Sequence, residues 1–165
     1  MRFDELYMVM QRPCEAMTLR LTLNPSVASQ LYDEVMARTY ARWSTLRLRK
    51  VPHRFVARSV LGKSINFTLS GRLAEMAQPR NPGTSGLSES DAETLNDRRA
   101  VAAGLKRLRR PVRESVAYMN LAGFGVADTA QLAGIDDTEA QRLATRGLAD
   151  LRGWLTTEQF DVLVA

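Results

Sequence analysis

The stretch from Val126 to Leu148 constrains the fold more than any other part of the chain. Its alanines and leucines recur at helical spacing in two segments, and Gly134 lies between them. Because glycine reaches a left-handed backbone without a Cβ clash, Gly134 predicts a tight turn between two helices. Asp136 or Asp137 can cap the second helix, with Glu139 in its first turn. The pattern therefore predicts a helix-turn-helix.

The second helix of this motif turns polar side chains outward, while Ala140, Leu143 or Ala144, and Leu148 face inward. A helix with such an outer face can enter the major groove of DNA. The candidate groove residues are Thr138, Gln141, Arg142, Thr145 and Arg146. An ordinary helical hairpin with a solvated outer face is the alternative explanation of the same pattern.

Positive charge gathers in two blocks of the chain, although the net charge of the whole is only +5. No Asp or Glu occurs between Val35 and Ala74, a span that contains nine Arg or Lys residues. A second block, from Arg98 to Arg113, holds seven basic residues and no acid. Such blocks suit the phosphate backbone of nucleic acids or an acidic protein surface. A solvated helix face is the alternative.

Composition excludes several other classes of protein. One cysteine, Cys14, excludes a disulfide framework, and one histidine, His53, excludes a histidine-rich metal site. The chain has no glycine-rich phosphate loop, and Asp136 with Asp137 fits a helix start better than a catalytic carboxylate pair. We therefore expect neither an enzyme nor a cofactor. No signal-peptide pattern or membrane-length apolar run occurs, so we expect a soluble, cytoplasmic protein without membrane insertion.

Apolar residues at helical spacing predict two helices in the first 50 residues. The first begins near Phe3, and Pro13 bends or interrupts it. The second begins at Asn24 and Pro25, where asparagine can cap and proline suits the first turn. Its apolar face continues at four-residue spacing as far as Trp43, which predicts one long amphipathic helix.

A third helix is predicted to begin at Val51-Pro52, because proline suits a first helical turn. Gly62 lies inside this helix, where it either kinks the backbone or admits a close neighbour. Ser70-Gly71 ends the helix unless Leu73 and Met76 extend it. The segment 78–92 is rich in proline, glycine and serine, so we predict a flexible linker there.

The linker divides the chain into two predicted domains, residues 1–77 and residues 93–165. Asp91 is a candidate cap for the first helix after the linker, and Pro111 begins the next helix. The apolar residues of the last ten positions either fold back on the core or cap a partner. The predicted fold class is all-α, with two small helical domains.

Long segments in both halves carry a resemblance to a known family. The first half contains F-D-E-L-Y and then L-T-L-N-P-S-V-A-S-Q-L-Y-D-E-V-M-A-R-T-Y-A-R-W, followed by V-P-H-R-F-V-A-R-S-V. The second half contains R-R-A-V-A-A-G-L-K-R-L-R-R-P-V-R-E-S-V-A-Y-M-N-L-A-G-F-G-V-A-D-T-A-Q-L-A-G-I. These segments are similar to regions two and four of the extracytoplasmic-function sigma factors, the smallest class of sigma subunits of bacterial RNA polymerase. Two helical domains joined by a linker, with no middle domain, are also the order of that family.

The resemblance implies a function for each half. Region two would dock on core RNA polymerase through Gln30, Asp33, Glu34 and Arg38. It would also open the downstream element of promoter DNA and hold the flipped bases with Arg54, Phe55, Arg58, Lys63 and Asn66. Region four would place the candidate groove residues in the upstream element, with flanking phosphates bound by Arg109, Arg110 and Arg113. The usual control of this family implies an anti-sigma protein as a further partner.

Two other functions remain open. One is a stand-alone helix-turn-helix regulator with an unrelated helical module at its N-terminus; LuxR-type regulators resemble this chain in their C-terminal pattern. The acid-free block from Val35 to Ala74, with Trp43, Phe55 and Phe67, argues against that function, because a ligand-sensing module would not need it. The other is a sigma-like interaction protein that does not melt promoters, which the low basic content of the second motif helix favours slightly.

Overall fold

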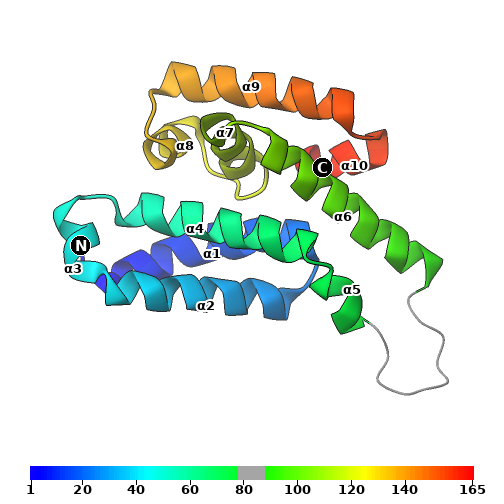
Figure 1. The fold of residues 1–165 in the computed structure, drawn as a ribbon. Coiled ribbons are helices and arrows are strands. Elements are labelled where there is room, and N and C mark those ends of the chain that lie inside the picture. The colour runs from blue at the N-terminus through cyan, green and yellow to red at the C-terminus, as the bar shows by residue number, and fades with distance from the viewer. Residues whose placement is uncertain (78–87) are drawn as a thin grey trace.

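The fold is all-α, as predicted. The computed structural model describes residues 1–77 and 88–165, and every regular element in these two ranges is a helix (Figure 1). The helices are α1 (Phe3–Thr22), α2 (Pro25–Ala41), α3 (Trp43–Leu48), α4 (Pro52–Leu69), α5 (Arg72–Ala77), α6 (Glu89–Arg107), α7 (Arg110–Asn120), α8 (Val126–Ala133), α9 (Asp137–Trp154) and α10 (Thr157–Val164).

Several predicted helix ends are confirmed by their capping geometry. The Asn24 side chain accepts a hydrogen bond from the Val27 amide at 3.2 Å, and Pro25 occupies the first turn of α2. The Asp136 carboxylate accepts from the Glu139 amide at 2.8 Å and so caps α9. Gly134, between α8 and α9, has the left-handed backbone that the tight turn requires, with φ of 75°. The predicted helix-turn-helix therefore consists of α8 and α9.

Pro13 does not interrupt α1, contrary to one of the predicted alternatives. The helix continues through it because Leu6 and Met10 before it, and Cys14 after it, are buried on one face. Proline removes the backbone donor that would bond to the carbonyl of Val9. Val9 is 58 % exposed, so water can satisfy this carbonyl and the cost of the missing hydrogen bond is small.

Two other predictions for the first half are corrected. The long second helix was expected to reach Trp43, but α2 ends at Ala41 and Trp43 begins the separate helix α3. Gly62 does not admit a close neighbour, since a Cβ added there would meet nothing within 4 Å. The helix α4 continues through this glycine from Pro52 to Leu69. Beyond Ser70-Gly71, Leu73 and Met76 do not extend α4; they belong to the short helix α5.

Most of the predicted linker, residues 78–87, lies outside the described residues. The residues 89–92 are the first turn of α6 and not part of a linker. Ser88 caps this helix by accepting a hydrogen bond from the amide of Asp91 at 3.1 Å, so Asp91 is not the cap.

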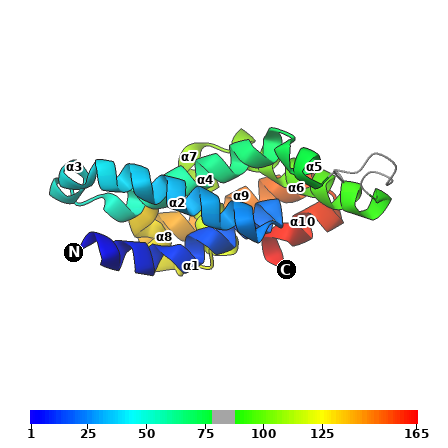
Figure 2. The same ribbon diagram turned by 90° about the horizontal axis from the view of Figure 1, so that it is seen from below.

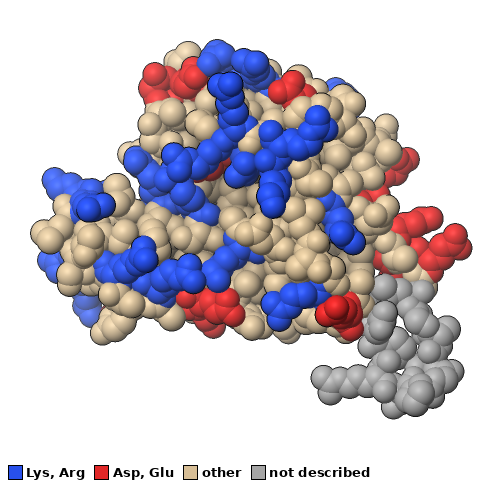
Figure 3. All heavy atoms as spheres, viewed as in Figure 1, with Lys and Arg blue, Asp and Glu red and all other residues tan. Residues whose placement is uncertain are grey.

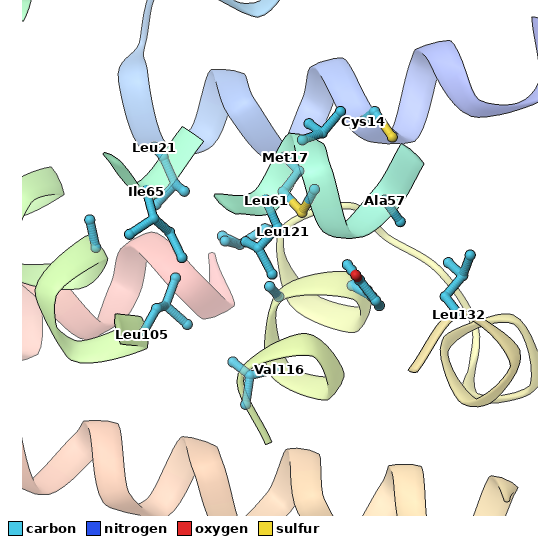
Figure 4. Close-up of a cluster of buried hydrophobic side chains, with 14 of the residues drawn as sticks. Cys14, Met17, Leu21, Ala57, Leu61, Ile65, Leu105, Val116, Leu121 and Leu132 are labelled. Carbon is cyan, nitrogen blue, oxygen red and sulfur yellow. The ribbon is translucent and has the colours of Figure 1, made fainter. Parts of the chain in front are cut away.

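The two halves of the chain pack directly on each other, which the sequence did not predict. The helices α1, α2 and α4 form one layer (Figures 1 and 2). The helices α6, α7 and α8 pack on one side of this layer, and α9 lies on the outer side of α7 and α8. Figure 4 shows the buried contact between the two halves: Met17 of α1 and Leu61 and Ile65 of α4 lie toward Leu105 of α6 and Leu121 after α7. One continuous apolar core therefore joins both halves.

The C-terminal residues fold back on this core, as one of the predicted alternatives had it. Val162 and Leu163 of α10 are buried in the apolar cluster that contains residues of both halves. The Arg20 guanidinium of α1 donates to the carbonyls of Val162 and Ala165, at the C-terminal end of α10. A cation is stabilised at that end of a helix, because the helix dipole is negative there. Among the described residues, no helix combines the length and apolar character needed to span a bilayer.

Candidate nucleic-acid interface

The outer side of α9 presents the predicted groove residues to solvent. Thr138, Gln141, Arg142, Thr145 and Arg146 are all exposed, and we call this set the recognition face. The opposite side of α9 is buried: Ala140, Leu143 and Ala144 pack inward, as expected for the second helix of the motif. The Asp136 side chain caps the start of α9, next to Thr138 and Gln141 of this face. The geometry is that of a helix that can lie in a major groove.

Within the described residues, Arg142 is the one member of the recognition face that is held in an ion pair. Its Nε and Nη2 atoms donate to the Glu139 carboxylate at 2.9 and 2.6 Å. This hydrogen bond from Arg142 lowers the pKa of Glu139 below its usual value and raises the pKa of Arg142. Both side chains are solvent-accessible, so the pair can exchange for a phosphate or base contact at little cost.

A groove runs beside the recognition face, between α9 and the junction of α6 with α7. Its volume is about 510 Å³, and the arginines that line it are Arg107, Arg109, Arg142 and Arg146. The Arg107 guanidinium lies 4.0 Å from the ring centroid of Trp154, which stands at the end of α9. The lining also includes the acids Glu139 and Asp150, so the four arginines leave the groove with an excess of positive charge. Such an excess beside an aromatic ring suits a sugar-phosphate backbone.

The three predicted phosphate contacts at the start of α7 have different surroundings. Arg109 and Arg110 are exposed, and Arg109 lines the groove. Arg113 instead donates to the carbonyls of Leu105, Lys106 and Leu108, at 2.9, 3.0 and 2.8 Å. These bonds satisfy the C-terminal end of α6, so Arg113 acts inside the protein's own structure.

The predicted downstream-element residues do not form one open surface. Arg54 and Arg58 point from α4 to the second half of the chain. Arg54 donates to the carbonyl of Gln131 at 3.2 Å, at the end of α8. Arg58 donates from Nε and Nη2 to the Glu114 carboxylate of α7, at 2.9 and 3.4 Å. Both arginines therefore serve the contact between the halves in this structure.

The remaining downstream candidates lie on other sides of α4. Phe55 is half-buried, with the Arg42 guanidinium 5.7 Å from its ring centroid. Lys63 pairs with Glu34 of α2 at 3.4 Å, and Asn66 is exposed. The structure thus separates these three side chains from the two arginines.

The predicted polymerase-binding residues share one exposed surface on α2. Gln30, Asp33, Glu34 and Arg38 all lie on its solvent side, and a shallow depression there includes the first three. Hydrogen bonds order the surface: the Tyr7 hydroxyl donates to Asp33 at 2.8 Å and Gln30 donates to Glu34 at 3.3 Å. The Asp33 hydrogen bond raises the pKa of Tyr7. Figures 1 and 2 place α2 on the far side of the molecule from α9.

Charge is unevenly spread over the face that carries α4, α7 and α9. In Figure 3 the Lys and Arg side chains form a band across this face, and most acidic side chains lie near its edges. A nucleic acid approaching this face would meet a positive potential before making any specific contact.

Sequence reasoning missed two features of this region. Glu114 is the only charged side chain that is fully buried in the described part of the chain, at 1 % exposure. It follows directly after the acid-free block that ends at Arg113 and lies four residues from Arg110, with which it pairs at 3.8 Å. That spacing was a readable signal for a helical ion pair. The stacking of Arg107 on Trp154 had no comparable local signal.

Comparison with known proteins identifies no relative. No family model matches the chain. Neither a curated protein nor a solved structure is significantly similar to it. The assignment of function therefore depends on the residues and geometry described above.

Proposed function

We propose that this protein is a transcription initiation factor of the sigma type, which binds core RNA polymerase and directs it to promoter DNA. The single observation that carries the DNA-binding part is the recognition face. Five exposed polar or basic side chains on α9 adjoin a groove whose lining includes four arginines and two acids. The amide of Gln141 and the guanidinium groups of Arg142 and Arg146 match the donors and acceptors of the major groove.

The placement of the other candidate surface supports the polymerase-binding part. The α2 surface lies on the opposite side of the molecule from α9 (Figure 1). One protein could therefore contact polymerase with α2 while α9 reads duplex DNA. In this proposal, residues 1–77 and 93–165 work as two modules, and the protein acts in the cytoplasm. An anti-sigma protein would be a further partner.

The first test is duplex binding. We expect wild-type protein to select a preferred duplex from a random pool of sequences. Arg146→Ala should then bind that duplex about tenfold less tightly, the usual effect of losing one base or phosphate contact. Arg152→Ala is the matched control, because Arg152 is also an exposed arginine of α9 but packs beside Phe160, away from the groove. Equal affinities for the two variants would contradict the recognition face.

The second test is binding to bacterial core polymerase and transcription from genomic fragments. Arg38→Ala should weaken binding to core polymerase, whereas Arg12→Ala, an equally exposed arginine on α1, should not. Specific transcripts would establish the sigma function. Polymerase binding without transcripts would favour an interaction protein that does not melt promoters.

A stand-alone helix-turn-helix regulator is the second candidate, and one observation favours it. Arg54 and Arg58, which a sigma factor would need for the downstream element, are engaged with the second half of the chain. Specific duplex binding by a protein that does not bind core polymerase would establish this function instead.

A further inference from the structure

We propose that Glu114 occupies the place of a nucleic-acid phosphate on α4, so that closure of the two halves and binding of a single strand by α4 exclude each other. We call the Arg58–Glu114 ion pair the latch. This inference rests on the proposed function for the role of α4 in binding nucleic acid. The latch itself is defined by the contacts between α4 and α7.

The latch has the geometry of arginine recognising an anion. Two nitrogens of Arg58 bond to the two oxygens of Glu114, at 2.9 and 3.4 Å. Arg110 adds a second cation 3.8 Å from the same carboxylate. An arginine fork binds a carboxylate and a phosphate in the same two-point manner. A phosphate that reaches Arg58 therefore has to displace Glu114.

Because Glu114 is buried, the latch can form only when the two halves are packed on each other, which we call the closed arrangement. The Glu114 side chain is only 2 % exposed, whereas that of Arg58 is 38 % exposed. A buried carboxylate requires a charged or hydrogen-bonding partner. If Arg58 turned to a phosphate, Glu114 would lose its closest partner unless α7 moved and let water reach it. Binding at Arg58 is thereby coupled to the separation of α7 from α4.

Arg54 extends the same competition by one helical turn. It lies four residues before Arg58, on the same side of α4. Its guanidinium donates to the carbonyl of Gln131 and lies against Gly134, where an added Cβ would be 3.1 Å from the guanidinium carbon. The C-terminal end of a helix attracts a cation, as a phosphate does. The second half therefore covers both α4 arginines with groups that substitute for phosphate.

The two halves are in equilibrium between a closed arrangement and an open one in this proposal, and the apolar contact between them favours the closed arrangement. Leu61 and Ile65 of α4 are buried with Leu105 and Leu121 of the second half (Figure 4). This burial favours closure in the absence of ligand. A nucleic acid shifts the equilibrium only by the difference in its affinity for the open and closed arrangements, and the two α4 arginines supply that difference.

The test compares Glu114→Gln with Glu93→Gln, which makes the same charge change at an exposed position of α6. The probe is a fluorescein-labelled single-stranded DNA oligonucleotide of mixed sequence, titrated at low ionic strength. Glu114→Gln should bind it about tenfold more tightly than Glu93→Gln, because one charge-assisted pair no longer competes. Equal affinities, or no binding by either variant, would overturn the proposal.

A second measurement keeps the proposal open to test even if Glu114→Gln does not fold. Donor and acceptor dyes are attached to cysteines placed at the exposed positions Ala41 and Ala149, one in each half. Cys14 will not react, because burial raises the pKa of its thiol to about 12. Saturating this labelled protein, which keeps Glu114, with the oligonucleotide should lower the energy transfer as the halves separate. If the oligonucleotide saturates the protein and the energy transfer does not change, the proposed latch is wrong.

Duplex binding, measured on the same samples, separates this proposal from the proposed function. Glu114→Gln should retain the duplex affinity of wild type, since Glu114 of α7 is buried, whereas the recognition face lies on the exposed side of α9. A gain in single-strand affinity without any duplex binding would contradict the recognition face and support the latch. Specific duplex binding without a gain in single-strand affinity would support the recognition face and contradict the latch.

Discussion

The arginines of α9 and those of α4 differ in what holds them. On α9, Arg142 pairs with Glu139 of its own helix, three residues away and in contact with solvent. On α4, Arg58 pairs with Glu114 of α7, which is 56 positions away and buried. Breaking the first pair needs only a side-chain rotation. Breaking the second either exposes the buried carboxylate or leaves it buried without its closest partner. Net charge alone does not distinguish two such basic surfaces; the location of the acidic partner does.

The same comparison extends to the first half as a whole. Three of its arginines, Arg20, Arg54 and Arg58, bind carbonyls or a carboxylate of the second half. Two of these contacts are at the C-terminal ends of helices, where a cation offsets the dipole. Part of the excess positive charge of the first half therefore holds the protein together. The recognition face, by contrast, makes no such contact in the described residues.

The largest expected difference is in stability. Arg58→Ala leaves the Glu114 carboxylate buried, with only Arg110 at 3.8 Å, and should lower the free energy of unfolding by about 3 kcal/mol. Arg146→Ala removes an exposed arginine from α9 and should change it by less than about 0.5 kcal/mol. Urea unfolding followed by circular dichroism measures both. Equal stabilities would mean that Arg58 is as dispensable to the fold as Arg146, and the contrast between the two surfaces would be lost.

A smaller effect is expected from the packing that positions α9. A Cβ added at Gly147 would lie 2.5 Å from Val116 Cγ2 and 2.8 Å from Val112 Cγ1, both on α7. Gly147→Ala should therefore destabilise the protein by about 2 kcal/mol, because α9 has to move away from α7. Gly153 is the control within the same helix, since a Cβ there meets nothing within 4 Å.

The control should move the melting temperature in the opposite direction. Gly153→Ala replaces glycine in a helix by a better helix former, which is worth up to about 1 kcal/mol. Thermal unfolding of the two variants side by side tests the prediction. A Gly147→Ala protein as stable as wild type would show that α9 and α7 are less closely packed than these distances indicate.

Features that depend on neighbouring residues were predictable from the sequence. Asn24 caps the amide three residues later, Asp136 does the same, and Gly134 supplies its own left-handed turn. Each requires only the local chain, so the helix-turn-helix and its exposed face could be predicted. Whether the helix continues through Pro13 was harder to predict, because proline favours a break while the apolar face continues on both sides of it.

Features that depend on distant residues could not be predicted in this way. The pairing of Arg58 with Glu114, and of Lys63 with Glu34, joins helices whose relative placement no local pattern specifies. The buried side of α4 carries Leu61 and Ile65, which fit an ordinary helix of a separate domain equally well. Only the fold shows that they pack on Leu105 and Leu121 of the second half.

The smallest expected effect concerns the ion pair on the recognition face. Because the hydrogen bond from Arg142 lowers the pKa of Glu139, the pair contributes stability above the ordinary pKa of a glutamate, and this contribution is lost as the pH falls through the lowered value. Titration followed by nuclear magnetic resonance should show the Glu139 pKa below the ordinary value of a glutamate in wild type and closer to that ordinary value in Arg142→Ala. The same Glu139 pKa in both proteins would mean that Arg142 is not held by Glu139 in solution. Arg142 would then already be available to DNA, and the contrast with the buried pair on α4 would be sharper still.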